Sequence, residues 1–188
     1  MPEPTPWVGV GPRTGEAALV EAFSAVDGEA WEWPWDFRGG RSRVVRTPWG
    51  VTVGLYSETL FGRVVVAVDD DRSDLVAALR PVCPLRTPAE LTAAFLDAPS
   101  SRDRADAVLG LASAAGVHRE VTVPELEKCV ALALDDDEPW LRLIALRAAA
   151  MLPVAVAHRL LTDREDPQNP GLDVWRAHYA ERLTETGT

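Results

Sequence analysis

Apolar residues follow two different spacings in the two halves of the chain. Over 15–26 and 74–80 they recur at the three- and four-residue intervals of an amphipathic helix. Between these segments, 43–47, 51–56 and 63–68 are β-branched runs separated by turn residues. The links between the runs are too short for parallel crossovers. The pattern therefore predicts an antiparallel β-meander with flanking helices.

Two segments near this meander have a less regular pattern. Trp31, Trp33 and Trp35 alternate with polar residues and with Pro34, which predicts either an extra strand at the sheet edge or an extended loop. Residues 1–14 are rich in proline and glycine, and we expect them to form a poorly ordered lead-in.

Prolines at 81, 84 and 88 interrupt the pattern, and every later segment has helical spacing. We place a domain boundary there, between a small α/β-meander domain at 15–82 and a helical domain at 87–184. Thr87–Glu90 and Thr122–Glu125 each have the sequence of a capping box that opens a helix. The expected helices cover 88–97, 101–115, 122–134, 138–151, 154–162 and 172–184.

The stretch 122–151 has the pattern of two apolar helices joined by a tight acidic turn. Such hairpins cannot bury their apolar faces alone, so they stack into solenoids. Internal echoes support stacking. At a shift of 38 residues, Leu96-Asp97 matches Leu134-Asp135, Arg104 matches Arg142, and Ala107 matches Ala145. A looser echo, at a shift of 34, matches Val174-Trp175-Arg176 to Trp140-Leu141-Arg142.

Leu134–Arg142, followed by Ala145 and Ala148-Ala149, resembles the core of a HEAT repeat. In that family an acidic turn between helices leads into a hydrophobic-Arg pair and then into small residues where the helices cross. The match is good over 122–151, partial over 89–115 and poor over 153–184. A generic helical bundle is the alternative. The resemblance implies a scaffold and no catalytic residue.

These observations predict an α+β protein, with a small N-terminal antiparallel β-meander and flanking helices, followed by C-terminal all-α HEAT-like helical hairpins. A short solenoid needs its two ends covered. We expect the N-terminal unit to cover the first hairpin. The last helix, with Arg176, Glu181 and Arg182 outward, would close the other end.

Composition narrows the classes of partner. The 188 residues carry a formal net charge of −10, and 47% are hydrophobic, which is typical of a folded protein. The negative charge disfavours nucleic acid and anionic membranes and favours a basic protein partner. Lys128 is the only lysine among many arginines, which is typical of a GC-rich bacterial genome.

The sequence also indicates a cellular location. No apolar run is long enough to cross a membrane, and the N-terminus lacks the pattern of a secretory signal. Cys83 and Cys129 lie far apart without metal-ligand spacing, so we expect buried free thiols instead of a disulfide. Together these features predict a cytoplasmic protein.

Asp136, Asp137 and Glu138 in the acidic turn are candidate partner-binding residues. The favoured interpretation is structural: Asp137 or a neighbouring aspartate caps the next helix, and the carboxylates interact with its dipole. Calcium would need a patterned set of oxygen ligands and usually a glycine, and the turn has neither.

Trp31, Trp33 and Trp35 are the second candidate partner-binding set, because Trp is enriched at interface hot spots. The favoured alternative is a Trp-lined core beneath a small sheet.

Two further patterns have weaker signatures. Arg38, Arg41, Arg43 and Arg46 could contact RNA, but no aromatic RNA-binding signature accompanies them, and a surface hairpin is favoured. Gly9–Gly15 precedes a helix like a phosphate loop, yet no Lys-Ser/Thr pair follows it, so we expect no nucleotide cofactor.

Catalytic signatures are absent from the sequence. His118, His158 and His178 lack the spacing of a two-His metal motif, so we predict no catalytic, cofactor or metal residues. The favoured function is a non-enzymatic protein-interaction module of the bacterial cytoplasm, either an adaptor or an immunity- or antitoxin-like inhibitor. The alternatives are a ligand-binding protein or enzyme with a Trp-rich N-terminal pocket, and nucleic-acid binding through Arg38–Arg46.

Overall fold

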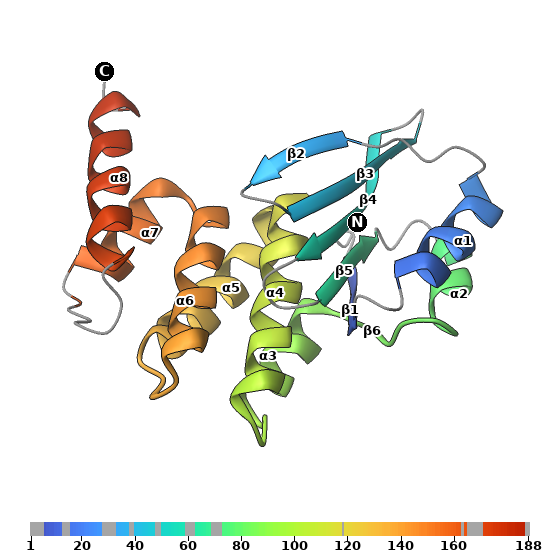
Figure 1. Ribbon diagram of the computed structural model, residues 1–188, viewed down its shortest axis with the longest axis horizontal. Coiled ribbons are helices and arrows are strands. Elements are labelled where there is room, and N and C mark those ends of the chain that lie inside the picture. The colour runs from blue at the N-terminus through green and yellow to red at the C-terminus, as the bar shows by residue number, and fades with distance from the viewer. Residues whose placement is uncertain are drawn as a thin grey trace.

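Strands from the N-terminal half form one antiparallel sheet in the computed structural model (Figure 1). The model describes residues 6–12, 16–27, 33–37, 40–47, 50–58, 63–68, 73–117, 119–162, 164 and 171–186. Its strands are β1 (Trp7–Pro12), β2 (Trp33–Phe37), β3 (Gly40–Thr47), β4 (Gly50–Glu58), β5 (Arg63–Val68) and β6 (Leu85–Arg86). They pair in the order β2-β3-β4-β5-β1-β6, and every pairing is antiparallel.

The predicted meander is confirmed. β3, β4 and β5 pair in chain order, and β2 lies at the sheet edge, as predicted for an extra edge strand. The β3–β4 register shifts between Val45 and Arg46, where the strands approach their turn.

The prediction of a poorly ordered lead-in at 1–14 is wrong for Trp7–Pro12, which forms β1 inside the sheet. Its two glycines and final proline give the sequence the composition of a turn. Packing decides otherwise: a Cβ on Gly9 would lie 2.5 Å from the Cys83 sulfur and 3.1 Å from Val66 Cγ1. Gly9 is therefore the residue that lets β1 lie this close to its neighbours.

Most of the other described residues are helical, so the predicted α+β class is confirmed. The helices are α1 (Glu16–Asp27), α2 (Ser73–Leu79), α3 (Pro88–Leu96), α4 (Ser101–Val117), α5 (Arg119–Leu134), α6 (Pro139–Ala148), α7 (Val154–Thr162) and α8 (Gly171–Thr186). A 3₁₀ turn, Ala149–Met151, extends α6.

Both faces of the sheet are covered at β5, which explains the apolar run of this strand. Val66 and Val68 pack with residues of α1 and α2 in one cluster. Val65 and Ala67, which alternate with them, belong to the cluster of the C-terminal helices. The chain thus forms three layers, with α1 and α2 on one side of the sheet and the helical stack on the other (Figure 1).

The larger core crosses the predicted domain boundary. Val8, Val65 and Ala67 of the sheet share one cluster of buried residues with Leu91 and Leu111 of the helices. α4 packs against β1, β4 and β5. The expectation that the N-terminal unit covers the first hairpin is therefore confirmed, and the segments 15–82 and 87–184 are not separately packed units.

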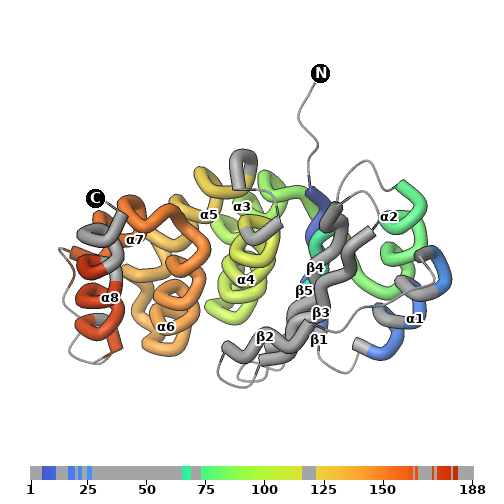
Figure 2. Tube along the Cα trace, turned by 90° about the horizontal axis from the view of Figure 1, so that it is seen from above, coloured from blue at the N-terminus to red at the C-terminus, as the bar shows by residue number. Residues whose placement is uncertain are grey.

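The C-terminal helices stack as hairpins in two rows. α3, α5 and α7 form one row, and α4, α6 and α8 form the other (Figure 2). α3 packs on α4 and α5, and α4 packs on α6, whereas α8 packs mainly on α7. The third hairpin is thus the least closely joined to its neighbours.

One predicted helix start is confirmed and one is wrong. Thr87 and Glu90 form a complete capping box at α3. At the second predicted box the helix starts earlier, at Arg119, and Pro124 lies inside it. Thr122 is therefore buried in α5, and its hydroxyl has no hydrogen-bond partner within the described part of the chain. Tertiary packing has extended this helix past the local start signal.

Candidate functional site

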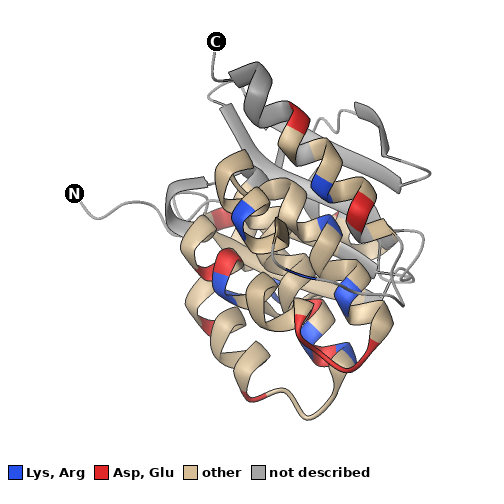
Figure 3. Cartoon of the chain, turned by 90° about the vertical axis from the view of Figure 1, so that its left-hand side faces the viewer, with Lys and Arg blue, Asp and Glu red and all other residues tan. Residues whose placement is uncertain are grey.

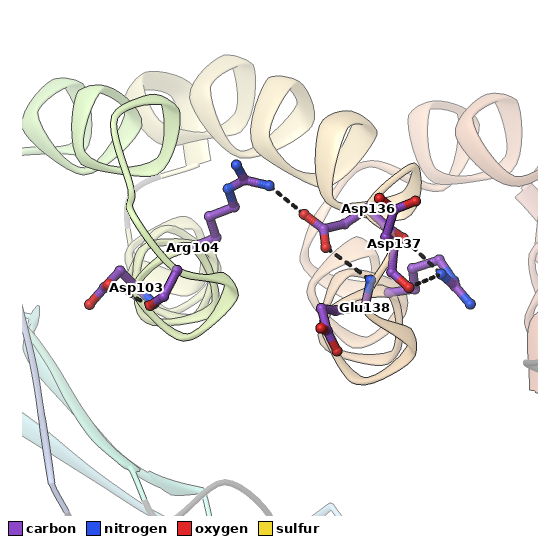
Figure 4. Close-up of polar contacts among 7 residues, drawn as sticks. Asp103, Arg104, Asp136, Asp137 and Glu138 are labelled. Carbon is purple, nitrogen blue, oxygen red and sulfur yellow. Dashed lines mark hydrogen bonds and ion pairs between the residues drawn. The ribbon is translucent and has the colours of Figure 1, made fainter.

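The turn between α5 and α6 contains three of the predicted partner-binding residues, Asp136, Asp137 and Glu138. We call residues 135–138 the acidic turn. Figure 4 shows Asp136, Asp137 and Glu138 at the start of α6, with Asp136 directed toward Arg104 of α4. The turn receives hydrogen bonds from arginines of three separate elements: Arg104 of α4, Arg142 of α6 and Arg164 after α7.

Arg104 reaches the acidic turn from the neighbouring hairpin. Its Nη1 donates to Asp136 Oδ2 at 2.5 Å, and the Asp136 side chain is only 7% exposed (Figure 4). A carboxylate this far buried requires a charged or hydrogen-bonding partner. The pair therefore joins the first hairpin to the second, and it leaves little of Asp136 available to another molecule.

Arg142 holds the backbone of the same turn. Its Nη1 donates to the carbonyl oxygens of Asp136 and Asp137 at 2.7 and 3.1 Å. Asp136 Oδ1 in turn accepts the Glu138 N–H at 3.0 Å. Glu138, not Asp137, is the N-cap of α6, and it makes no side-chain capping bond. The capping prediction thus holds only in that a neighbouring aspartate satisfies an N–H just before the helix.

Arg164 fixes the acidic turn from the third hairpin. It forms an ion pair with Asp135 and donates to the carbonyl oxygens of Leu160 and Ala131. Partial burial lowers the pKa of this guanidinium below its ordinary value, though it stays charged at neutral pH. Three hairpins therefore converge on one turn.

These contacts leave two carboxylates of the turn for a partner. Asp137 and Glu138 are exposed and form no ion pair among the residues the structure describes. Along the described helices in Figure 3, acidic positions and Lys or Arg positions occur close together on the same elements. Charge alone therefore does not define a binding site here.

Sequence reasoning missed several exposed apolar side chains of the helical stack. Trp140 and Leu143 of α6 are 37% and 36% exposed, and Val174 of α8 is 70% exposed. Leu132 of α5 and Leu96 of α3 are 46% and 49% exposed. Trp140 and Leu143 are three residues apart and share one face of α6. A signal was present, because α6 buries Leu141, Ile144, Ala145 and Ala148, and 140 and 143 lie outside that seam.

The second predicted set cannot be assembled into a site. Trp33 and Trp35 lie in β2, at the edge of the sheet. Trp31 lies outside the described residues, and the side chains of β2 are not described. Of the arginine set, Arg41, Arg43 and Arg46 lie in β3, and Arg38 lies outside the described residues. Both sets stay predictions.

Titratable groups suited to catalysis do not converge in the described part of the chain. His158 contacts Thr162 in α7, while His178 packs edge-on against Trp175 in α8, with ring centroids 6.0 Å apart. His118 lies outside the described residues. No group of three His, Cys, Asp or Glu residues in the described ranges could hold a metal ion.

The two cysteines are free and buried, as predicted. Burial raises the pKa of Cys83 and raises that of Cys129 to about 11. Both thiols therefore stay protonated at neutral pH, which makes them poor nucleophiles. Both side chains pack inside the fold. The Cys83 sulfur lies against Gly9, where an added Cβ would be 2.5 Å away, and the Cys129 sulfur lies 4.0 Å from the Thr92 hydroxyl oxygen.

Comparisons with protein-family models, curated proteins and solved structures gave no match. Among the residues of the described ranges, no helix has the length and apolar character needed to cross a membrane.

Proposed function

We propose that this chain is a non-enzymatic protein-interaction module that binds another protein through its helical stack. The observation that carries the proposal is the exposure of Trp140, Leu143 and Val174 on the surface of α6 and α8. Single exposed apolar residues are ordinary, but on α6 an exposed Trp shares a helix face with an exposed Leu, and Trp is enriched at interface hot spots. Helical stacks present such surfaces to partners.

A matched pair of buried alanines supports a HEAT-like character for the hairpins. Ala107 and Ala145, matched in sequence, are both fully or almost fully buried. The matched arginines make different contacts, since Arg142 donates to carbonyl oxygens of the α5–α6 turn and Arg176 donates to Thr162 at the end of α7, at 2.7 Å. The buried alanines and the order of the hairpins therefore favour stacked repeats over an irregular bundle.

The class of partner follows from charge. With a net charge of −10, the chain would meet a basic protein rapidly, because opposite charge raises association rates. An adaptor or an immunity- or antitoxin-like inhibitor of the bacterial cytoplasm is the version we propose. The two free, buried thiols are compatible with a reducing compartment.

The test is site-specific photo-cross-linking in the source cell. A photoreactive amino acid replaces Trp140 or Val174 in separate variants, and Ala155 or Arg159, which are exposed on α7, in matched controls. We expect one protein to be captured through 140 and 174 and not through 155 or 159. Equal capture at all four positions, or none at 140 and 174, would contradict the proposal.

A further inference from the structure

Two neighbouring helices of the stack carry exposed apolar side chains together with exposed carboxylates. We define the α6–α8 strip as Trp140, Leu143 and Val174 together with Asp137, Glu138 and Asp173. All six are exposed, and Asp173 is exposed over 82% of its side chain. α6 and α8 are neighbours in one row and both begin at the same end of the stack (Figures 1 and 2).

The two halves of the strip lie at the starts of their helices. Trp140 precedes Arg142 by two residues, and Val174 precedes Arg176 by two residues. α6 begins at Pro139 and α8 at Gly171, so both apolar residues lie in the first turns of their helices. The strip thus contains an exposed apolar residue near the start of each helix.

The position in the first hairpin that corresponds to Leu143 is buried. Ala105 of α4 corresponds to Leu143 of α6 at the 38-residue shift, and it is 3% exposed. α4 packs against both α6 and the sheet, whereas the sheet does not extend along the stack to α8 (Figure 1). A small buried residue in α4 is therefore replaced, one repeat later, by a large exposed one in α6.

Some charged side chains in and around the strip are engaged in contacts among the described residues, whereas others are not. Arg142 and Arg176 are engaged with backbone carbonyls, and Arg176 also pairs with Asp173. Asp137 and Glu138 form no ion pair with any residue of the described ranges. The carboxylates open to a partner lie at the turn end of the strip, while Arg147 lies one turn beyond Leu143 at the other end.

We infer that the α6–α8 strip binds a basic amphipathic helix of another protein. An amphipathic helix presents an apolar row with the spacing i, i+3, i+4 and i+7. Such a row can contact the exposed apolar side chains of two adjacent helices, here α6 and α8. The cationic residues of that helix lie over Asp137 and Glu138, and its apolar row contacts Trp140, Leu143 and Val174. A second copy of this chain is disfavoured, because each copy carries a net charge of −10.

This inference rests on the proposed function, and a peptide selection tests it separately. A library of displayed 16-residue peptides is selected against the full-length chain, and the enriched peptides are synthesised. We expect lysine or arginine to be enriched together with apolar residues at helical spacing. Enrichment of neutral or acidic peptides would overturn the inference.

Variants then locate the bound peptide. We expect Trp140→Ala and Val174→Asp each to weaken peptide binding by about tenfold or more, measured by fluorescence anisotropy. The matched control Ala155→Asp, on the exposed face of α7, should leave affinity unchanged. Unchanged affinity in both strip variants would overturn the inference. Circular dichroism melting of each variant shows that its fold is intact.

Neutralising two carboxylates tests whether they contribute to peptide binding. Glu138→Gln together with Asp137→Asn should slow association at low salt more than it speeds dissociation, and the difference should shrink at high salt. A salt-independent association rate would contradict the electrostatic part. Dimerisation of the chain that is lost in Trp140→Ala, seen by sedimentation velocity, would instead identify a second copy as the occupant and overturn the inference.

The two proposals fail in different ways. If a protein is cross-linked at 140 and 174 but the selected peptides lack basic residues, the proposed function is supported and the basic helix is contradicted. If basic peptides bind the strip but no protein is captured in the cell, the binding preference of the strip is supported and the proposed function is contradicted.

Discussion

The two ends of the helical stack differ in what packs against them. At one end α4 packs under the sheet, and its buried residues share a cluster with Val8, Val65 and Ala67. At the other end α8 packs mainly on α7, and Val174 is exposed. A short solenoid needs its ends covered. The sheet of the same chain covers the end at α4. Near the other end, we propose that the α6–α8 strip binds a partner protein.

The largest contrast should come from removing a side chain at each end. Leu111 of α4 is fully buried in the shared cluster, so Leu111→Ala should lower the free energy of unfolding by about 2–5 kcal/mol. Val174→Ala, at the open end, should change it by less than about 0.5 kcal/mol. Urea unfolding followed by circular dichroism measures both. Similar losses in the two variants would show that the open end is as well packed as the covered one.

A second prediction adds volume in place of removing it. A Cβ on Gly110 would lie 3.0 Å from Leu91 Cδ1 and 3.1 Å from Val10 Cγ2, so the helix, α3 and β1 meet at this residue. Gly110→Leu should destabilise the fold by about 1–3 kcal/mol, because overpacking outweighs the gain in helix propensity. Ala177→Leu on the exposed side of α8 is the matched control and should be close to neutral. Thermal melting distinguishes them.

A smaller effect separates a buried ion pair from an exposed one. Arg104→Met leaves the Asp136 carboxylate, 7% exposed, without its cation. Because Arg104 itself is 39% exposed and partly screened, we expect a loss of about 1–2 kcal/mol. Arg159→Met breaks the exposed pair with Glu127 and should cost less than about 1 kcal/mol. Asp136→Asn in the Arg104→Met background should recover part of the loss; no recovery would mean that the arginine acts by packing.

The smallest effect compares two helix starts. α3 has a full capping box, whereas α6 starts at Glu138 without a side-chain cap. Thr87→Ala should cost about 1 kcal/mol in urea unfolding. A comparable cost for Glu138→Ala would contradict the difference between the two starts.

The same box gives a pH dependence with a defined sign. The Thr87 N–H donates to Glu90 at 2.7 Å, and this hydrogen bond lowers the pKa of the Glu90 carboxyl below 4.5. The stabilisation is present above about pH 4.5 and is lost as the pH falls through the lower folded value. Glu90→Gln should flatten the acid side of the stability profile, measured by melting between pH 5 and pH 3. An unchanged profile would show that the bond is too weak to matter.

Local signals predicted most elements of the fold. The β-branched runs of β3, β4 and β5 and the capping box at Thr87 act through nearby residues alone, so periodicity and spacing were sufficient. β1 was missed because its glycines and proline resemble a turn, and its strand pairing comes from β5, more than fifty residues away. The start of α5 was misplaced because the helix begins at Arg119, before the local cap signal, and Thr122 is buried inside it.

The candidate site was only partly predictable. The sequence selected the acidic turn, and the three arginines that hold it come from positions up to 32 residues away. It did not select Trp140, Leu143 and Val174, because an apolar residue in a helix is normally assigned to the core.

Composition and periodicity by themselves determined the α+β class, the meander and the helical hairpins of the C-terminal half. They could do so because each helix or strand is specified by residues within a few positions of one another. Tertiary structure alone decided that β1 joins the sheet, that one core crosses the predicted domain boundary, and which apolar side chains of α6 and α8 face outward. Those outcomes depend on which surfaces meet, and the residues that meet there are distant in sequence.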